Sequence, residues 1–220
     1  MTRLFNFRQR AQALMVALGL TLMLGSVHAA TGPDPVPEAV LTLQQHWAHA
    51  NYETEGKARK QSFVALTEEA DQLVATMPDE ADAHIWAGIV YSTYAGEVSM
   101  FKAGKQVKRA RTELERALEL DPEAMNGAAY TSLGALLYQI PGFMGGDDQQ
   151  AEELLITGLS LNADGIDSNY FYATYLIDQK REDEALAYLE KALQAPDRPG
   201  RPIADVGRRA EVRIALQELN

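Results

Sequence analysis

Three segments of this chain repeat the same order of residue types, and this internal repeat limits the fold more than any other feature. Each segment opens with a small residue beside aromatic residues or leucine, and continues with an alanine and then spaced apolar residues. Apolar residues recur every three to four positions throughout, which predicts helices, and no useful stretch alternates as a strand would. The segments run from Trp86 to Pro122, from Tyr130 to Asn162 and from Tyr172 to Pro196.

The order of these residues resembles the tetratricopeptide repeat, a helix-turn-helix unit of about 34 residues. Small residues at Gly88, Gly134 and Ala173 would let the two helices of a hairpin approach closely. We therefore predict an all-α fold, a right-handed tetratricopeptide-like superhelix of helical hairpins with about nine helices. The alanines expected to face these small residues from the second helices are Ala110, Ala151 and Ala185.

Proline, glycine and capping residues set the ends of the predicted helices. Asp147 or Asp148 can cap the helix that follows a glycine pair, because a carboxylate accepts from free N–H groups of a first turn. Extra residues at 96–104 and 141–146 are interpreted as lengthened hairpin loops. The predicted helices are 36–50, 57–76, 80–95, 103–120, 123–139, 148–161, 167–179, 182–194 and 203–218.

The first 29 residues have the three parts of a secretory signal peptide. Three arginines and no acidic residue come first, Leu14–Leu24 is an apolar run, and small residues follow up to Ala29. Cleavage after Ala29 is expected, because small residues suit the signal peptidase. A membrane anchor needs roughly 20 apolar residues, and this run is shorter. The sequence therefore predicts a soluble periplasmic protein with no stable membrane insertion.

The repeat and the signal peptide together divide the chain. The segment before the first clear repeat matches the pattern poorly, but terminal units of repeat arrays are usually atypical. A helix after the last repeat would cover the other end of the array. The predicted parts are a cleaved signal peptide (1–29), a mobile leader (30–36), a divergent N-terminal hairpin (37–79), three tetratricopeptide-like hairpins (80–196), and a linker with a capping helix (197–220).

Composition narrows the class of partner. The chain has no cysteine, so it can form neither a disulfide nor a lipid-anchored cysteine. Its 31 acidic residues exceed its 20 lysines and arginines, for a net charge of −11, and loss of the signal peptide makes the charge more negative. An acidic surface disfavours nucleic acid and anionic lipid as partners. A protein partner or a small apolar ligand is expected instead.

The concave groove of a tetratricopeptide-like array is lined by the first helices of its hairpins. These helices are rich in tyrosine here, which offers both contact area and a hydroxyl group to a ligand or partner. By the register of the repeat, the residues expected to line the groove are Ile85, Ile89, Thr131, Ala135, Tyr138, Tyr170 and Thr174.

The one basic cluster in this acidic sequence is a candidate docking patch for an acidic partner or an anionic solute. Alternatively, its side chains form a solvated helix face, with Arg109 and Arg111 each paired to the glutamate four residues later, Glu113 and Glu115. The lysines of the candidate patch are Lys102, Lys105 and Lys108.

No catalytic constellation is predicted. His46 and His49 could share a helix face, but no cysteine or closely spaced carboxylate completes a set of metal ligands. No serine lies in a nucleophile elbow, and no glycine-rich loop has the Lys-Ser/Thr ending of a phosphate-binding loop. Residues 162–167 lack the glutamate that a calcium loop requires. We therefore predict a protein that is not an enzyme and has neither a cofactor nor a metal ion.

The region from Ile85 to Arg209 resembles a narrower family. Its motifs are similar to those of bacterial exported proteins grouped with the T component of TRAP transporters, which are helical repeat proteins associated with periplasmic solute uptake. The regulator-of-microtubule-dynamics family has the same layout of loops and hairpins. The motifs are Lys105–Lys108, Glu113–Pro122, Ser132–Gly134, Tyr138–Gly142, Gly145–Asp147, Asp164–Asp167, Asn169–Tyr172 and Arg198–Pro202.

The resemblance implies an exported scaffold that binds a partner protein, as an accessory component of TRAP-type periplasmic uptake. The partner would be a solute-binding or transporter subunit. An alternative hypothesis is a periplasmic carrier that binds a small apolar or amphipathic ligand between the hairpins. The sequence also leaves a homo-oligomer open. In each case, binding is inferred from the architecture and from the lack of predicted catalytic residues.

Overall fold

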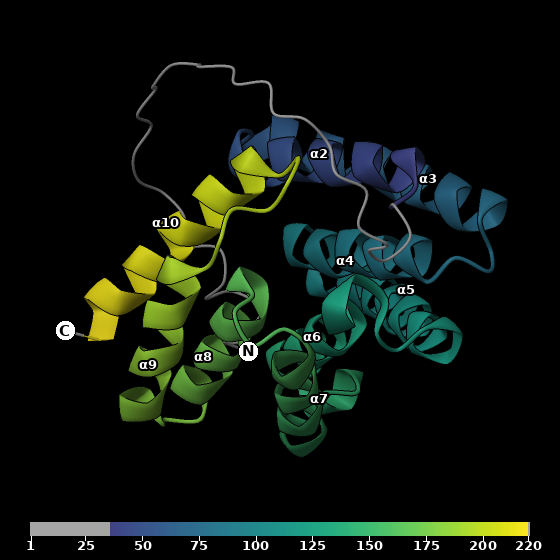
Figure 1. Ribbon diagram of the computed structural model, residues 1–220. Helices are drawn as coiled ribbons and strands as arrows, with labels where there is room; N and C mark the ends of the chain where they lie inside the picture. Colours follow the sequence, from purple (N-terminus) through teal and green to yellow (C-terminus); the bar gives the residue numbers. More distant parts are fainter. Residues whose placement is uncertain (1–35, 220) are drawn as a thin grey trace, which may run out of the picture.

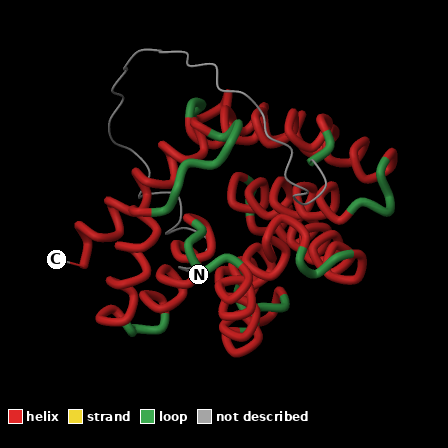
Figure 2. The backbone as a smooth tube through the Cα atoms, viewed as in Figure 1, coloured by secondary structure: helices red, strands yellow, loops and turns green. Residues whose placement is uncertain are grey.

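The computed structural model describes residues 36–219, and this part of the chain contains nine α-helices, one short 3₁₀ helix and no strand (Figure 2). The predicted signal peptide and nearly all of the leader lie outside the described residues, as does Asn220. The elements are α2 (Glu38–Tyr52), α3 (Gly56–Thr76), α4 (Ala81–Glu97), α5 (Met100–Leu120), α6 (Ala124–Gln139), η1 (Gly142–Met144), α7 (Asp148–Leu161), α8 (Ile166–Asp178), α9 (Glu182–Gln194) and α10 (Pro202–Leu219).

Eight of these helices pair into four hairpins, α2 with α3, α4 with α5, α6 with α7 and α8 with α9 (Figure 1). The first helices of successive hairpins contact one another, α2 with α4, α4 with α6 and α6 with α8, so they form the inner face of a curved array. The last helix, α10, packs against α9 and α8 and also against α2, which brings the two ends of the array together. The predicted tetratricopeptide-like superhelix is confirmed.

Glycines in the first helices allow the hairpins to pack closely. A Cβ atom on Gly88 would lie 2.5 Å from Cγ of Leu114, and one on Gly134 would lie 2.8 Å from Cγ of Leu155. Both distances are too short for a real side chain, so the second helix occupies the space that a larger residue would need. The predicted close approach at these two glycines is therefore confirmed. The facing alanines, Ala110, Ala151 and Ala185, are fully buried.

The interpretation of residues 96–104 as a lengthened loop is wrong. Helix α4 continues to Glu97 and α5 begins at Met100, so only a two-residue link separates them. The extra residues lengthen the helices, because a single glycine inside a helix costs only about 1 kcal/mol and tertiary packing outweighs it. The second predicted loop, at 141–146, is present and contains η1.

Most helix ends lie within three residues of the predicted ones, and α7 and α9 have the predicted bounds. Of the two candidate caps for α7, Asp147 takes this role, because its Oδ1 accepts a hydrogen bond from the Gln150 N–H at 2.9 Å. Asp148 lies in the first turn, where a negative charge suits the helix dipole.

Helix α6 begins with a left-handed turn. The sequence predicted a regular helix from residue 123 and did not include this turn. Met125, Asn126 and Gly127 have φ angles of 50°, 56° and 74°, so the regular right-handed helix starts only after them. A Cβ atom on Gly127 would lie 2.6 Å from Cδ1 of Leu161, at the end of α7. The turn thus lets the chain pass close to α7 before α6 proceeds.

Ion pairs hold α10 against the rest of the array. Arg208 on α10 donates from Nε to Oδ1 of Asp167 on α8 at 2.8 Å. Arg198, in the segment before α10, also donates to Asp167, and its Nε donates to Oδ1 of Asp205 at 2.6 Å. Burial alone would raise the pKa of Asp167, but the guanidinium groups of Arg198 and Arg208 hold it well below its usual range.

Candidate functional site

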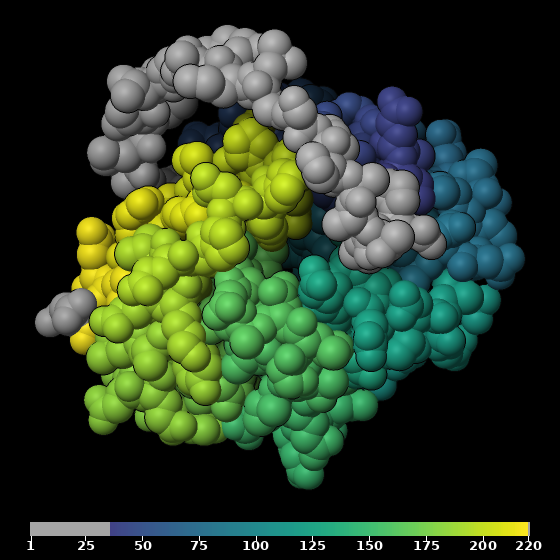
Figure 3. Space-filling model, viewed as in Figure 1, coloured from purple at the N-terminus to yellow at the C-terminus, as the bar shows by residue number. Residues whose placement is uncertain are grey.

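A hollow of about 1210 Å³ lies on the inner face of the array. Residues of α2, α4, α6 and α8 form its walls, and residues of the segment 196–201 close one side. In Figure 3 α10, in yellow, lies between the dark blue N-terminal region and the green helices, in agreement with its contacts with α2, α8 and α9. Sites for small molecules usually measure roughly 300–1,000 Å³, so the hollow is large enough for such a ligand.

Two tryptophans form an aromatic wall of the hollow. Trp47 and Trp86 are the only tryptophans in the chain, and both line the hollow. Their rings meet edge to face with centroids 5.8 Å apart, and Nε1 of Trp47 donates to Oγ1 of Thr93 at 3.1 Å. The guanidinium group of Arg201 lies over Trp86, 5.0 Å from the ring centroid. The wall therefore combines apolar area with a cation.

Arg208 is the buried centre of the polar side of the hollow. It pairs with Asp167 and donates from Nη1 to Oε2 of Glu211 at 2.5 Å. Its guanidinium group also lies over the rings of Tyr170 and Phe171, at 4.5 and 4.6 Å from their centroids. Burial raises the pKa of Glu211, although Arg208 opposes this shift. Nε and Nη1 of Arg208 thus both donate to carboxylates of the protein.

Three of the predicted groove residues, Ile89, Thr131 and Ala135, line the hollow. Ile85 does not, because it lies one turn earlier on α4 and is completely buried in the core. Helix α4 contacts α2, α3, α5 and α6, so most of its circumference is covered by other helices. The register of the repeat identified the inner helices correctly, but neighbouring helices cover α4 at Ile85 and leave the hollow open only at Ile89, one turn later on the same face.

Tyr138, Tyr170 and Thr174 were also expected in the groove, but none of them lines the hollow. Tyr138 and Thr174 lie between α6 and α8, and the ring of Tyr170 lies under the guanidinium group of Arg208 on α10. Oη of Tyr138 lies 2.9 Å from Oγ1 of Thr174, which joins the two helices by a hydrogen bond. Burial raises the pKa of both tyrosines, so their phenol groups stay neutral at ordinary pH. The hydroxyl group of Tyr138 is used within the protein, by Thr174 and Gln139.

Several residues of the hollow were not predicted from the sequence. The segment Arg198-Pro-Gly-Arg-Pro202 was recognised only as a motif and as a linker, yet it brings Arg198 and Arg201 to the hollow. Gln44 and Trp47 come from α2, a helix that matches the repeat poorly. The two arginines among the prolines of this linker were the one available signal of a site. Charged linkers usually lie in solvent, so sequence reasoning did not place these arginines in the hollow.

The candidate docking patch lies on α5 and not in a loop, and its three lysines are exposed. Two phenylalanines stand near it: Phe101 is 97% exposed and Phe143, in η1, is 79% exposed. The next residue, Met144, reaches α5 beside Gly104, where its Cε would lie 4.0 Å from an added Cβ. The name basic-aromatic patch is used below for Phe101, Lys102, Lys105, Lys108 and Phe143.

The arginines that follow this patch serve structural roles. Arg111 pairs with Glu115 at 2.7 Å, as the helix-face alternative predicted. Arg109 does not pair with Glu113 but forms an ion pair with Asp71 on α3, because a tertiary carboxylate lies within its reach. The lysines, and not these arginines, are thus the basic groups that the patch presents to solvent.

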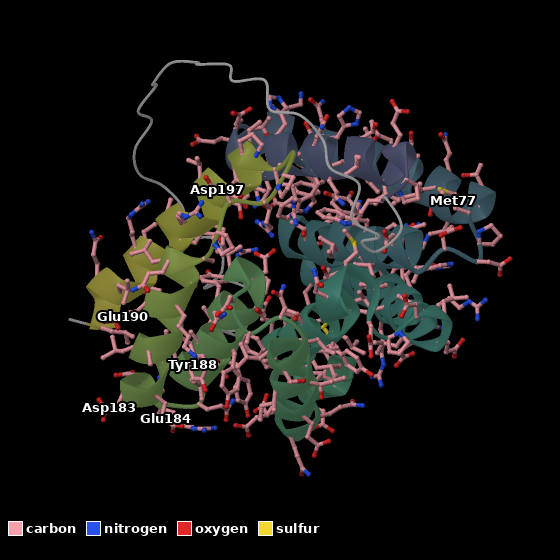
Figure 4. All side chains as sticks on the ribbon, viewed as in Figure 1. Met77, Asp183, Glu184, Tyr188, Glu190 and Asp197 are labelled. Atoms are coloured by element: carbon pink, nitrogen blue, oxygen red, sulfur yellow. The ribbon has the colours of Figure 1, made fainter. Side chains whose placement is uncertain are left out.

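The outer face of α9 has the opposite charge. Asp183, Glu184 and Glu190 are exposed on this helix and lie at the edge of the molecule (Figure 4). Arg181 neutralises part of the charge through its ion pair with Glu184, at 2.7 Å. The acidic character that the composition predicts is therefore visible on this surface, far along the array from the basic-aromatic patch.

The two histidines of α2 each pair with one glutamate. Nδ1 of His46 lies 2.8 Å from Oε2 of Glu69, and Nδ1 of His49 lies 2.6 Å from Oε2 of Glu53. Among residues 36–219, no group of three or more His, Asp or Glu side chains is arranged to hold a metal ion.

No helix in the same range combines the length and apolar character needed to span a bilayer.

Comparison with solved structures agrees with the observed architecture. The chain is similar to a thermophilic tetratricopeptide-repeat protein of Thermus thermophilus, with a TM-score of 0.54 and 21% sequence identity. The match covers 80% of this chain and 89% of the other. At this level of identity the similarity establishes the fold alone. A search of curated proteins found no match.

A family model gives a more specific result. The model described as the TRAP transporter T-component matches residues 46–204. This range starts within α2 and includes the rest of the first hairpin, the other three hairpins and the segment that closes the hollow, up to the first turn of α10. The chain therefore belongs to the TRAP transporter T-component family.

Proposed function

We propose that this chain is a non-catalytic accessory component of TRAP-type solute uptake and that it acts by binding a protein partner. Its family supports the link to uptake, and its fold supports protein binding, because curved helical arrays offer extended surfaces to a partner. The basic, apolar and small segments of residues 1–29 support a location in the periplasm. The partner that fits these features is the solute-binding subunit of the uptake system.

The basic-aromatic patch is the observation that carries this proposal. A phenylalanine that is 97% exposed is unusual in a monomeric protein, because burial of a large apolar side chain is favourable by about 1.5–3 kcal/mol. Three lysines beside two such rings would attract an acidic surface and steer its approach. Aromatic residues are enriched at interface cores, and lysines suit the rim. The patch therefore fits an acidic protein surface.

Site-specific crosslinking tests this proposal in the native host. A photoreactive residue would replace Phe101 or Phe143, and a matched control would replace Val206, which is 70% exposed on α10. Crosslinks to the solute-binding subunit are expected from the first two positions and not from Val206. The double variant Phe101→Ser/Phe143→Ser should reduce co-purification of that subunit about tenfold, whereas Val206→Ser should not. Equal crosslinking at all three positions would contradict the choice of surface.

A second candidate function is that of a carrier for a small apolar or amphipathic ligand. The hollow favours it, because a volume of about 1210 Å³ with an aromatic wall exceeds what a scaffold alone requires. Native mass spectrometry of protein purified from periplasm tests this function. A carrier should retain a small molecule with defined mass, whereas a scaffold should show the mass of the polypeptide alone.

A further inference from the structure

Three residues that line the hollow each carry a buried N–H donor that has no acceptor within the described part of the protein. The donors are the side-chain amide of Gln44 on α2, the indole Nε1 of Trp86 on α4, and Nε of Arg201 before α10. Gln44 is 4% exposed and Trp86 is 2% exposed, so bulk solvent does not readily satisfy them. A buried donor without an acceptor destabilises a protein, and native proteins rarely leave such donors unpaired.

Arg201 stands out from the other two arginines of the hollow. Arg198 and Arg208 pair with Asp167, Asp205 and Glu211, which are the acidic groups of the buried cluster. Within residues 36–219 Arg201 forms no such pair, and its guanidinium group lies on the face of Trp86. Burial, and then repulsion by Arg198, lowers the pKa of Arg201 to about 10, so this group is still positively charged at neutral pH.

We propose that the hollow binds an amphipathic carboxylate, with the carboxylate group accepting hydrogen bonds from Arg201 and Trp86 and with Gln44 as a third donor. Donors without acceptors call for a ligand group that only accepts, and the unpaired guanidinium calls for a negative charge. The planar fork of an arginine matches the two oxygens of a carboxylate. This inference rests on the second candidate function, the carrier, and is independent of partner docking.

The rest of the hollow sets the remaining properties of the ligand. Apolar side chains of α2, α4, α6 and α8 would contact an apolar body, and the volume admits a chain of a dozen or so carbons. Carboxylates also line the hollow and would repel a second negative charge, so a singly charged head group fits better than a phosphate monoester. The apolar residues include Leu41, Ile89, Ala135, Leu136, Ile140 and Phe171, and the carboxylates outside the buried ion-pair cluster are Asp79, Glu80, Asp82, Asp121, Glu123 and Asp164.

Intrinsic fluorescence gives a direct readout, because both tryptophans of the chain line the hollow. Purified protein would be titrated with dodecanoate, dodecanol and dodecyl phosphate, each below its critical micelle concentration. Dodecanoate should change the emission with a saturating curve and bind at least tenfold more tightly than either other compound. Equal binding of dodecanoate and dodecanol would overturn the carboxylate site, as would tighter binding of dodecyl phosphate.

Variants then assign the donors. Arg201→Gln should weaken dodecanoate binding about tenfold or more. It should leave dodecanol binding unchanged, and that unchanged affinity would show that the hollow of the variant is still folded. Trp86→Phe keeps the ring and removes the N–H donor, so it should weaken dodecanoate binding several-fold, with Trp47 as the reporter. The matched control is Arg213→Gln, at an exposed position of α10, which should have no effect.

Two further results would reject the inference. Arg201→Gln and Arg213→Gln could have the same small effect, which would mean that the guanidinium group of Arg201 does not contact the ligand. Alternatively, none of the three compounds could bind, which would reject the carrier function together with the carboxylate site. The crosslinking at Phe101 and Phe143 uses a different surface, so either result leaves the proposed partner docking intact.

Discussion

Gly207 on α10 lies directly against the ring of Tyr52 on α2, and a Cβ atom on this glycine would be 2.2 Å from Cδ1 of the tyrosine. Oη of Tyr52 also donates to Oε2 of Glu211, one turn further along α10, at 3.4 Å. The first and last described helices thus meet through one aromatic ring. Closure of the array depends on the absence of a side chain at residue 207.

Gly207→Ala should therefore destabilise the protein, although alanine is the better helix former. The added methyl group would overpack the contact with Tyr52, at a cost of about 1–3 kcal/mol, which lowers Tm by roughly 2–4 °C per kcal/mol in a chain of this size. Thermal unfolding followed by circular dichroism measures this change. In a Tyr52→Ala background the same substitution should be neutral or slightly stabilising, and an equal cost in both backgrounds would disprove the contact.

Two glycines of α4 should respond in opposite ways to alanine. Gly88→Ala should cost about 1–3 kcal/mol, because the new Cβ would lie 3.2 Å from the carbonyl oxygen of Ala110 and closer still to Leu114. Gly96→Ala meets no atom within 4 Å and should stabilise the helix by up to about 1 kcal/mol. Urea unfolding of both variants measures the difference. If both substitutions had the same sign, the close hairpin contact would not control stability at Gly88.

Asp167→Asn should weaken the attachment of α10 in a pH-dependent way. Because the pKa of Asp167 is held below its usual range in the folded protein, its stabilising contribution is fully present above about pH 5 and is lost as the pH falls toward the folded pKa. At pH 7 the variant should be less stable by about 2–3 kcal/mol, since one partner of a part-buried ion pair is neutralised.

The measurement is urea unfolding of wild type and Asp167→Asn at several pH values between 7 and 2. The difference between the two proteins should shrink steadily below about pH 5, where the unfolded carboxyl group begins to bind a proton. A difference that stays constant over this range would show that the charge of Asp167 does not stabilise the fold. Asp197→Asn, at an exposed side chain paired with Arg209, provides the control and should change stability little.

Two variants at the cap of α7 separate the contribution of the Asp147 hydrogen bond from that of its charge. Asp147→Ala removes the acceptor for the Gln150 N–H and should cost about 1 kcal/mol. Asp147→Asn keeps a side-chain oxygen in the same place and should cost much less. Equilibrium unfolding of the two variants makes the comparison, and an equal loss in both would assign the effect to charge and not to the capping hydrogen bond.

Local patterns were enough to predict most helices. The bounds of α7 and α9 agree with the prediction because glycine, proline and capping residues stop helices through their own backbone chemistry. Gly88 and Gly134 were also recognised, because the repeat places them where two helices must approach. The loop predicted at 96–104 was wrong because glycine is a weak local signal. Its two glycines lower helix propensity only slightly, and the packing of α4 against α5 outweighs that loss.

The hollow could be predicted only in part. Ile89, Thr131 and Ala135 follow from the register of the repeat, whereas Tyr138 and Thr174 were misplaced because each hydroxyl group found a partner on the neighbouring helix. The partner of Arg109 was misassigned for a similar reason, since a spacing rule considers only one helix. Such errors concern which face a residue presents, and that depends on neighbours distant in sequence.

By itself, the sequence determined the helical hairpins and the acidic composition, because periodicity, turn residues and charge are properties of short stretches of chain. Only the tertiary structure decided that α10 returns to α2 and that Arg201 comes to lie over Trp86 inside a hollow. The angle between successive hairpins accumulates along the array, and small differences in side-chain packing set that angle. Contacts between the two ends of the chain therefore follow from the sum of all the interfaces between them.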